Sequence, residues 1–253
     1  MIDALLLDLS GVLYQGAKSI PGAANAVERA QRSGVQVRFI TNTSQKAREE
    51  LLSHLYALGF SLDSTQLFTA VDAARDWLQT RKLRPFCLVH ENIVGEFSDI
   101  DQHDPNAVFL ADAATGFSFE NLNRAFQLCM AGAPFLGIGY NRYCKSGDEL
   151  QLDAGPFVKA IEFAAGVEAT IVGKPSEVFF REVMASTQVS PERTIMVGDD
   201  VFSDVEGALR VGMNACLVKT GKYLPGDEHR ITGDFLTFDS VVEVVDFILK
   251  HRD

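Results

Sequence analysis

Four clusters of polar residues each come directly after a short apolar run of the sequence. In chain order the clusters are Asp8 with Ser10, Thr41 with Asn42 and Thr43, Lys174, and Asp199 with Asp204. Carboxylates are the hard oxygen ligands that octahedral Mg²⁺ prefers, and a lysine provides a point positive charge. Hydroxyl and amide groups beside backbone N–H groups suit the oxygens of a phosphoryl group. Together the clusters predict a phosphoryl-transfer site.

Asp8 is the candidate nucleophile of that site. A phosphoryl group in transfer spreads negative charge over its equatorial oxygens, so catalysis consists mainly of positioning and of placing cations and donors. We expect the Asp8 carboxylate to attack phosphorus in line and form an aspartyl phosphate, which water then hydrolyses. Mg²⁺ would screen the repulsion between the two anions, and Lys174 would help to keep Asp8 ionised.

The apolar runs are the elements that must position these residues. Residues 4–8 contain three consecutive leucines and end at Asp8, which is typical of a parallel strand buried on both faces. A proline–glycine pair opens an amphipathic helix over 23–33, and a second strand covers 35–40. Such a strand–helix–strand unit closes with a right-handed crossover. We therefore expect Asp8 and Thr41 at the carboxyl edge of one sheet, where open α/β sheets bind ligands.

The other elements follow from the same signals of apolar periodicity, glycine and proline. Further strands are predicted over 86–90, 106–111, 134–138, 169–173, 194–198 and 214–218. Further helices are predicted over 45–58 with Ser44 as its cap, and over 119–130, 178–187, 205–211 and 240–249. The expected fold is α/β, with a Rossmann-like parallel-sheet core over 1–81 and 167–253 and an inserted α/β cap over 82–166.

Composition excludes several classes of protein. The 253 residues carry a net charge of −11 at pH 7. A protein surface that binds nucleic acid or an anionic membrane needs clustered lysine and arginine, so this charge argues against both. The four cysteines lack the spacing of a metal site. The first residues do not have the pattern of a signal peptide, and no apolar run reaches the roughly 18 residues of a membrane span. We therefore expect a cytoplasmic protein that binds neither nucleic acid nor membrane.

The four motifs resemble, in order and spacing, those of the haloacid dehalogenase (HAD) superfamily of phosphatases. They are residues 8–13 (DLSGVL), Thr41-Asn42, Lys174-Pro175 and residues 198–204 (GDDVFSD). The insertion between the second and third motifs resembles the C2 type of cap, as in the NagD-like subgroup. The resemblance implies a HAD-like core with this cap and a Mg²⁺-dependent phosphohydrolase.

The resemblance also implies a set of metal ligands. Asp8 is then a Mg²⁺ ligand as well as the nucleophile, and Ser10 contributes its backbone carbonyl. Asp199 is the second carboxylate ligand, and Asp204 acts as an outer partner through water. Asp200 is the less certain of the two adjacent acids, because neighbouring residues of an extended turn point in different directions.

The same resemblance implies where the substrate binds. Thr41, Asn42 and Thr43 hold the phosphate, and Lys174 is the cation between the nucleophile and the phosphate. The cap then recognises the leaving group. Candidates there are the polar segment 140–145, with Arg142 and Lys145, and a turn over 153–156. The expected partner is a small phosphorylated molecule or a phospho-amino acid, and a homodimer through the cap stays open.

Ser10 departs from the pattern of most HAD phosphatases. The second position after the nucleophile is usually an aspartate, which protonates the leaving group and then activates water. A serine hydroxyl cannot do this near neutral pH, and general acid–base catalysis is typically worth about 10²- to 10⁴-fold, or about 3 to 5 kcal/mol of barrier. The site should favour substrates whose leaving group needs no proton or whose bond is already activated. Phosphoramidates such as phosphohistidine and phospholysine, pyrophosphate and aryl phosphates all meet this condition.

Three rival functions stay open at this point. A phosphotransferase or phosphomutase would pass the phosphoryl group from Asp8 to an acceptor other than water. A dehalogenase would also use an aspartate nucleophile, but Asp199 and Asp204 would then have no purpose. A phosphoryl-binding protein whose catalysis has decayed is suggested by Ser10, although the intact Asp8, Lys174 and Asp199 argue against it.

Restoring the missing acid tests the interpretation of Ser10. We predict that Ser10→Asp raises kcat/KM for an alkyl phosphate relative to an aryl phosphate by at least about tenfold, because only the alkyl leaving group needs the proton. Steady-state kinetics of the wild type and of Ser10→Asp on both substrates measure the ratio of the two kcat/KM values. An unchanged ratio would show that Ser10 does not set the leaving-group preference.

Overall fold

The computed structural model describes residues 1–146 and 149–252, and its contacts divide the chain into two compact units. The core unit comprises residues 1–41, 51–68 and 177–253, and the cap unit comprises residues 42–50 and 69–176. The longer cap segment is a single insertion between two parts of the core. Among the described residues, no helix is both long enough and apolar enough to cross a membrane.

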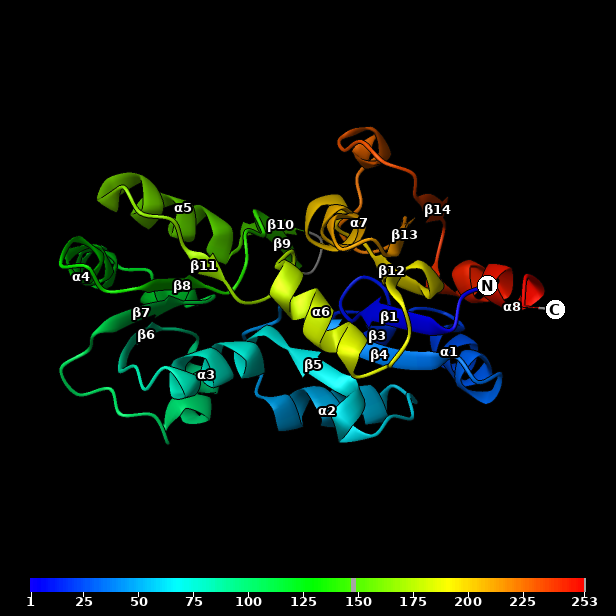
Figure 1. Ribbon diagram of the computed structural model, residues 1–253, viewed down its shortest axis with the longest axis horizontal. Coiled ribbons are helices and arrows are strands. Elements are labelled where there is room, and N and C mark those ends of the chain that lie inside the picture. Colours follow the sequence, from blue (N-terminus) through cyan, green and yellow to red (C-terminus); the bar gives the residue numbers. More distant parts are fainter. Residues whose placement is uncertain (147–148, 253) are drawn as a thin grey trace. The chain divides into compact units, whose positions relative to one another are not determined.

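A six-stranded sheet lies at the centre of the core unit (Figure 1). Its strands, in spatial order, are β14 (Leu236–Phe238), β13 (Asn214–Val218), β12 (Thr194–Gly198), β1 (Ala4–Asp8), β4 (Gln36–Thr41) and β5 (Leu67–Thr69). β1 pairs in parallel with β12 on one side and with β4 on the other. Every residue of β1 is buried, because a strand covered on both faces needs a continuous apolar run.

The helices of the core unit bury apolar stripes at helical spacing. They are α1 (Ala23–Arg32), α2 (Arg48–Ala57), which begins in the cap unit, α6 (Glu177–Ala185), α7 (Gly207–Arg210) and α8 (Val241–Lys250). In α8 the buried residues are Val241, Val244, Val245 and Ile248, and this helix packs against α1. The unit also contains the short strands β2 (Tyr14–Gln15) and β3 (Lys18–Ser19), 3₁₀ turns over Ser64–Gln66, Pro191–Arg193 and Asp227–His229, and a π-helical segment over Val201–Glu206.

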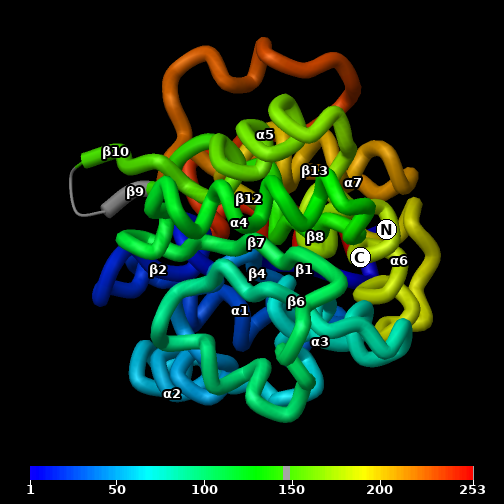
Figure 2. Tube along the Cα trace, turned by 90° about the vertical axis from the view of Figure 1, so that its left-hand side faces the viewer, coloured from blue at the N-terminus to red at the C-terminus, as the bar shows by residue number. Residues whose placement is uncertain are grey.

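The cap unit has its own parallel sheet. Its strands, in spatial order, are β11 (Thr170–Ile171), β8 (Phe135–Gly137), β7 (Ala107–Leu110) and β6 (Pro85–Leu88). Its helices are α3 (Ala70–Thr80), α4 (Phe119–Met130) and α5 (Ala154–Ala165), with 3₁₀ segments over Glu91–Phe97 and Ala114–Gly116. A separate antiparallel hairpin joins β9 (Tyr143–Ser146) and β10 (Glu149–Leu152), and Figure 2 shows these strands side by side. A second apolar core, distinct from that of the core unit, fills this unit.

The long cap segment runs over residues 69–176 in the structure, whereas the sequence predicted 82–166. α3 falls in the cap unit because its buried face, which includes Val71 and Leu78, belongs to the apolar core of the cap. β11 also falls there because Thr170 pairs with Leu136 of β8. The strand before Lys174, expected in the core sheet, therefore lies in the cap sheet.

Other local differences have clear physical causes. α2 begins only at Arg48, so Ser44 cannot cap it, and the Ser44 hydroxyl accepts a hydrogen bond from the backbone N–H of Asp112 at 3.1 Å instead. The turn expected over 153–156 is the start of α5, with Asp153 as its N-cap. The helix expected over 205–211 is the π-helical segment followed by the short α7. The β9–β10 hairpin has no counterpart among the predicted strands.

Glu162 of α5 connects three parts of the cap unit. Its carboxylate accepts hydrogen bonds from the Tyr140 hydroxyl at 2.6 Å and from the backbone N–H of Ala169 at 2.8 Å. It also pairs with the Lys159 ammonium at 2.7 Å. Burial opposes the charge on Glu162, but these hydrogen bonds and Lys159 outweigh it and lower the pKa of the carboxyl.

We predict that Glu162→Gln lowers the free energy of unfolding at pH 7 by about 1 to 2 kcal/mol, because hydrogen bonds to a charged acceptor are lost. A lowered pKa in the folded state means that this stabilisation is present above the unfolded value, near 4.3, and is lost as the pH falls through the folded value. Urea unfolding at pH 7 and pH 3 should show the difference between variant and wild type shrinking in acid. The exposed Glu149, changed to Gln, is the control and should show no such difference.

Candidate active site

Three carboxylates of the core unit form one buried cluster. Asp8 ends β1, Asp199 follows β12 directly, and Asp204 lies in the π-helical segment. An oxygen atom of each carboxylate lies within 4.8 Å of one from each of the other two, and the three residues are only 7%, 4% and 1% exposed. Because Leu7 lies opposite Val197 in the parallel register, Asp8 and Asp199 leave the sheet at the same edge.

Close backbone approach makes room for the cluster. A Cβ atom on Gly198 would lie 2.1 Å from Oδ2 of Asp204, and one on Gly11 would lie 2.0 Å from Oδ2 of Asp199. Gly11 also has a φ of +89°, a conformation that side chains disfavour. Glycine is therefore needed at both positions if the carboxylates are to lie where they do.

The charge of the cluster suits a divalent cation. Burial raises the pKa of Asp199 to about 8; Lys222 opposes this rise, and the negative charges of Asp8 and Asp204 add to it. Three buried carboxylates cannot all stay ionised at this spacing without a positive charge among them. Oxygen donors of this kind are the ligands of Mg²⁺, so Asp8, Asp199 and Asp204 are the residues that would hold it.

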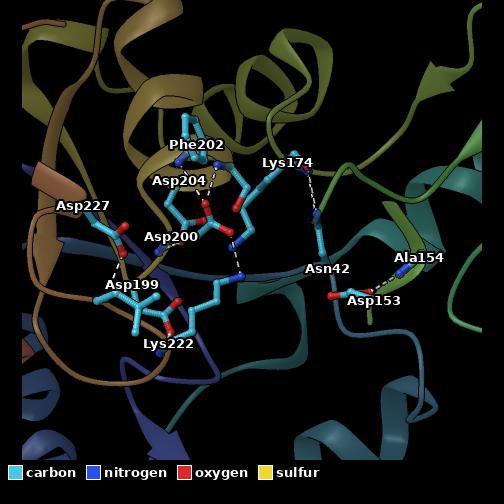
Figure 3. A network of polar contacts seen from close by, with 12 residues as sticks. Asn42, Asp153, Ala154, Lys174, Asp199, Asp200, Phe202, Asp204, Lys222 and Asp227 are labelled. Atoms are coloured by element: carbon cyan, nitrogen blue, oxygen red, sulfur yellow. Dashed lines mark hydrogen bonds and ion pairs between the residues drawn. The ribbon is translucent and has the colours of Figure 1, made fainter. Parts of the chain in front are cut away.

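The carboxylate of Asp200 does not belong to the cluster and has its own hydrogen-bond and ion-pair partners. Its Oδ1 accepts hydrogen bonds from the backbone N–H groups of Phe202 at 2.9 Å and Ser203 at 3.0 Å. Its Oδ2 pairs with the Lys222 ammonium at 2.7 Å, a contact visible in Figure 3. Burial opposes ionisation of Asp200, but the charge of Lys222 and these hydrogen bonds hold its pKa well below the usual range.

The segment 220–222 is part of this site, although no sequence motif marked it. The backbone N–H of Lys222 donates to Oδ2 of Asp199 at 2.8 Å, and the Thr220 hydroxyl donates to the carbonyl of Gly11. One signal could have found it, because the segment follows the apolar strand β13 as the four motifs follow theirs. Its residue types, however, are common in loops.

In the cap unit, Asn42 holds the backbone of Lys174. The Asn42 amide donates to the carbonyl of Lys174 at 2.8 Å and accepts from the N–H of Lys174 at 2.8 Å (Figure 3). A Cβ atom on Gly173 would lie 2.3 Å from Oδ1 of Asn42, so this contact also depends on a glycine. Lys174 is only 3% exposed. The side chain of Asn42 therefore has a positioning task that the sequence did not suggest, and its role toward phosphate stays a prediction.

The remaining predicted residues are placed as follows. In the core unit Thr41 is buried at the end of β4 and Ser10 is exposed; in the cap unit Thr43 is half-buried. Arg142 is exposed, and the side chain of Lys145 lies outside the described residues. The amide oxygen of Asn141 is buried and makes no hydrogen bond among the described residues. The roles of all these residues stay predictions.

Known proteins match this chain over nearly its whole length, and two known families each match a part of it. The haloacid dehalogenase-like hydrolase family matches residues 5–102, and a HAD-hydrolase-like family matches residues 171–244. The chain is 44% identical over 260 residues to the phospholysine phosphohistidine inorganic pyrophosphate phosphatase of Rattus norvegicus, covering 100% of this chain and 96% of that protein. It is 41% identical over 252 residues to the haloacid dehalogenase-like hydrolase domain-containing protein 2 of the same species, covering 99% and 97%.

Solved structures show the same fold. The 4-nitrophenylphosphatase of Thermotoga maritima superposes with a TM-score of 0.87 at 25% identity, covering 97% of both chains. A putative NagD protein superposes with a TM-score of 0.85 at 24% identity, covering 97% of this chain and 98% of that one. These comparisons define a capped α/β phosphohydrolase. The chain belongs to the haloacid dehalogenase-like hydrolase family, and the predicted fold class and family resemblance are confirmed.

Gly198 offers a direct test of the carboxylate cluster. We predict that Gly198→Ala weakens Mg²⁺ binding at least about tenfold, because the added methyl group displaces the Asp204 carboxylate. Isothermal titration calorimetry with Mg²⁺ measures this without any substrate. Gly95→Ala is the matched control, since a Cβ atom there meets nothing within 4 Å. Equal affinity of Gly198→Ala and wild type would mean that Asp204 does not support the metal.

Proposed function

We propose that this protein is a Mg²⁺-dependent phosphatase that hydrolyses small phosphorylated substrates through an aspartyl phosphate on Asp8. The observation that carries the proposal is the buried cluster of Asp8, Asp199 and Asp204 at the carboxyl edge of the core sheet. Asp8 is both a member of this cluster and the last residue of its strand, so a nucleophile and a metal site coincide. The family of the chain supports the same reaction class.

In the proposed mechanism the Asp8 carboxylate attacks phosphorus, and the bond between phosphorus and the leaving group breaks. Water then attacks the aspartyl phosphate, which releases inorganic phosphate and restores the carboxylate. Mg²⁺, when bound, neutralises the charge of the phosphoryl oxygens. Asp199 stays in place throughout as its proposed carboxylate ligand, and Asp204 as its proposed outer partner through water.

For Lys174 we propose the role of the cation that offsets the charge of the phosphoryl group. Two observations support this role: Lys174 stands in the third of four motifs, and both of its backbone polar groups are held by Asn42. A lysine whose backbone is fixed on both sides has less freedom to lose when it meets an anion. Thr41 and Thr43 are the proposed phosphate donors, through their hydroxyl or backbone N–H groups.

The substrate class that we propose is phosphoramidates or pyrophosphate. Ser10 provides no carboxylic acid to protonate a leaving group, which favours bonds that are already activated. The relative with 44% identity is named for phospholysine, phosphohistidine and pyrophosphate, which all carry such bonds. Aryl phosphates satisfy the same chemical argument, so the experiment must include one.

Phosphate release from a panel of substrates tests the function. We predict Mg²⁺-dependent release from phosphohistidine, phospholysine or pyrophosphate that EDTA stops and that Asp8→Asn reduces by at least about 10³-fold, because the nucleophile is lost. The panel also contains p-nitrophenyl phosphate and a sugar phosphate. Asp234→Asn, which changes an exposed carboxylate, is the control and should behave as wild type.

Each other outcome has a defined meaning. Faster release from p-nitrophenyl phosphate than from any phosphoramidate or pyrophosphate would reject the narrower substrate class but keep the phosphatase. Release that persists in Asp8→Asn would reject the aspartyl-phosphate mechanism. No release from any substrate would reject the phosphatase and favour either a transferase, which an added alcohol acceptor would reveal, or a phosphoryl-binding protein.

A further inference from the structure

We propose that the segment Thr220–Gly221–Lys222 is a positioning element for the carboxylate cluster. Through its own hydrogen bonds it fixes both the loop after β1 and the carboxylate of Asp199, and so sets the affinity for Mg²⁺. The proposal rests on the proposed function only in taking Asp8, Asp199 and Asp204 as metal ligands. All the residues involved belong to the core unit.

The first contact of the segment is with the loop that follows the nucleophile. The Thr220 hydroxyl donates to the carbonyl oxygen of Gly11, which is three residues beyond Asp8. The two backbones pass close to each other, since a Cβ atom on Gly221 would lie 2.5 Å from the Cα atom of Gly11. The loop that bears Ser10, the proposed carbonyl ligand, is therefore held from a point 209 residues further along the chain.

The second contact is with a proposed metal ligand. The backbone N–H of Lys222 donates to Oδ2 of Asp199 at 2.8 Å. A Cβ atom on Gly221 would lie 2.0 Å from the same oxygen, and Gly221 has a φ of +65°. The segment thus gives Asp199 a hydrogen-bond donor at Lys222 and, at Gly221, the space that its carboxylate occupies.

The third contact distinguishes the two adjacent acids, Asp199 and Asp200. The Lys222 side chain, which is 15% exposed, pairs with Oδ2 of Asp200 at 2.7 Å. Asp200 in turn donates its backbone N–H to Oδ2 of Asp204 at 3.2 Å. Lys222 therefore contacts Asp199 with its backbone and Asp200 with its ammonium group. This keeps one carboxylate in the cluster and neutralises the other outside it.

These contacts make Thr220 a positioning residue, because it acts through Gly11 and touches none of the three carboxylates in the hydrogen bonds described. Residues that orient metal ligands typically contribute about 10- to 100-fold to metal affinity or activity. A purely structural role would instead change the stability of the fold and leave the affinity of the folded protein for Mg²⁺ as it is. The two roles can therefore be separated by measuring both quantities.

The test compares Thr220→Val with Thr220→Ser. Valine keeps the shape of threonine but removes the hydroxyl donor, whereas serine keeps the donor. We predict that Thr220→Val weakens Mg²⁺ binding about tenfold in calorimetric titration, while Thr220→Ser stays within about threefold of wild type. The melting temperature in EDTA shows whether each variant is folded. Lys219→Gln, which changes a half-exposed neighbour paired only with Asp239 in the ion pairs described, is the control and should bind as wild type.

The outcomes separate this proposal from the proposed function. Thr220→Val that binds Mg²⁺ within twofold of wild type overturns the positioning role and leaves the phosphatase untouched. Thr220→Ser that binds as weakly as Thr220→Val also overturns it, because the hydroxyl is then irrelevant. The wild-type protein could bind Mg²⁺, with this binding weakened in Thr220→Val, and yet release no phosphate. That result would support the positioning role and reject the phosphatase. A wild-type protein that binds no Mg²⁺ overturns both.

Discussion

Repulsion among buried carboxylates is the constraint on which the site depends. Asp8, Asp199 and Asp204 lie within 4.8 Å of one another in a place almost closed to water. Ionised groups in such a place are costly unless opposite charge or hydrogen-bond donors compensate them. Burial and the negative charges of Asp8 and Asp204 accordingly raise the pKa of Asp199, against the opposing charge of Lys222. The same repulsion is what makes the cluster attractive to a divalent cation.

The backbone of the core unit positions the carboxylates, through the strand register, glycines and N–H donors. The parallel register of β1 and β12 brings the carboxylates to one edge, and glycines at 11, 198 and 221 leave the space that they fill. Backbone N–H groups of Lys222 and Asp200 donate to the cluster. The Lys222 ammonium pairs with Asp200, and its charge also opposes the rise in the pKa of Asp199.

The parts predicted well from the sequence are those with a strong local signal. A strand buried on both faces must be apolar throughout, so β1 and β12 and the acids at their ends stood out. The sheet to which a two-residue strand belongs has no such signal, and β11 was placed with the wrong sheet. Nor could the sequence show that Asn42 clamps Lys174, because the two residues are 132 positions apart and share no pattern. The contact of Thr220 with Gly11 was hidden for the same reason.

Ser10 connects this electrostatic argument to substrate choice. In the proposed mechanism the cluster acts on the phosphoryl group, which is the same in every substrate, so the cluster does not by itself distinguish one leaving group from another. A carboxylic acid at position 10 would supply the proton that a poor leaving group needs, and serine does not supply it. The proposed substrates therefore carry bonds that break without a proton, and we propose that the cap unit, which has its own sheet and apolar core, recognises the leaving group.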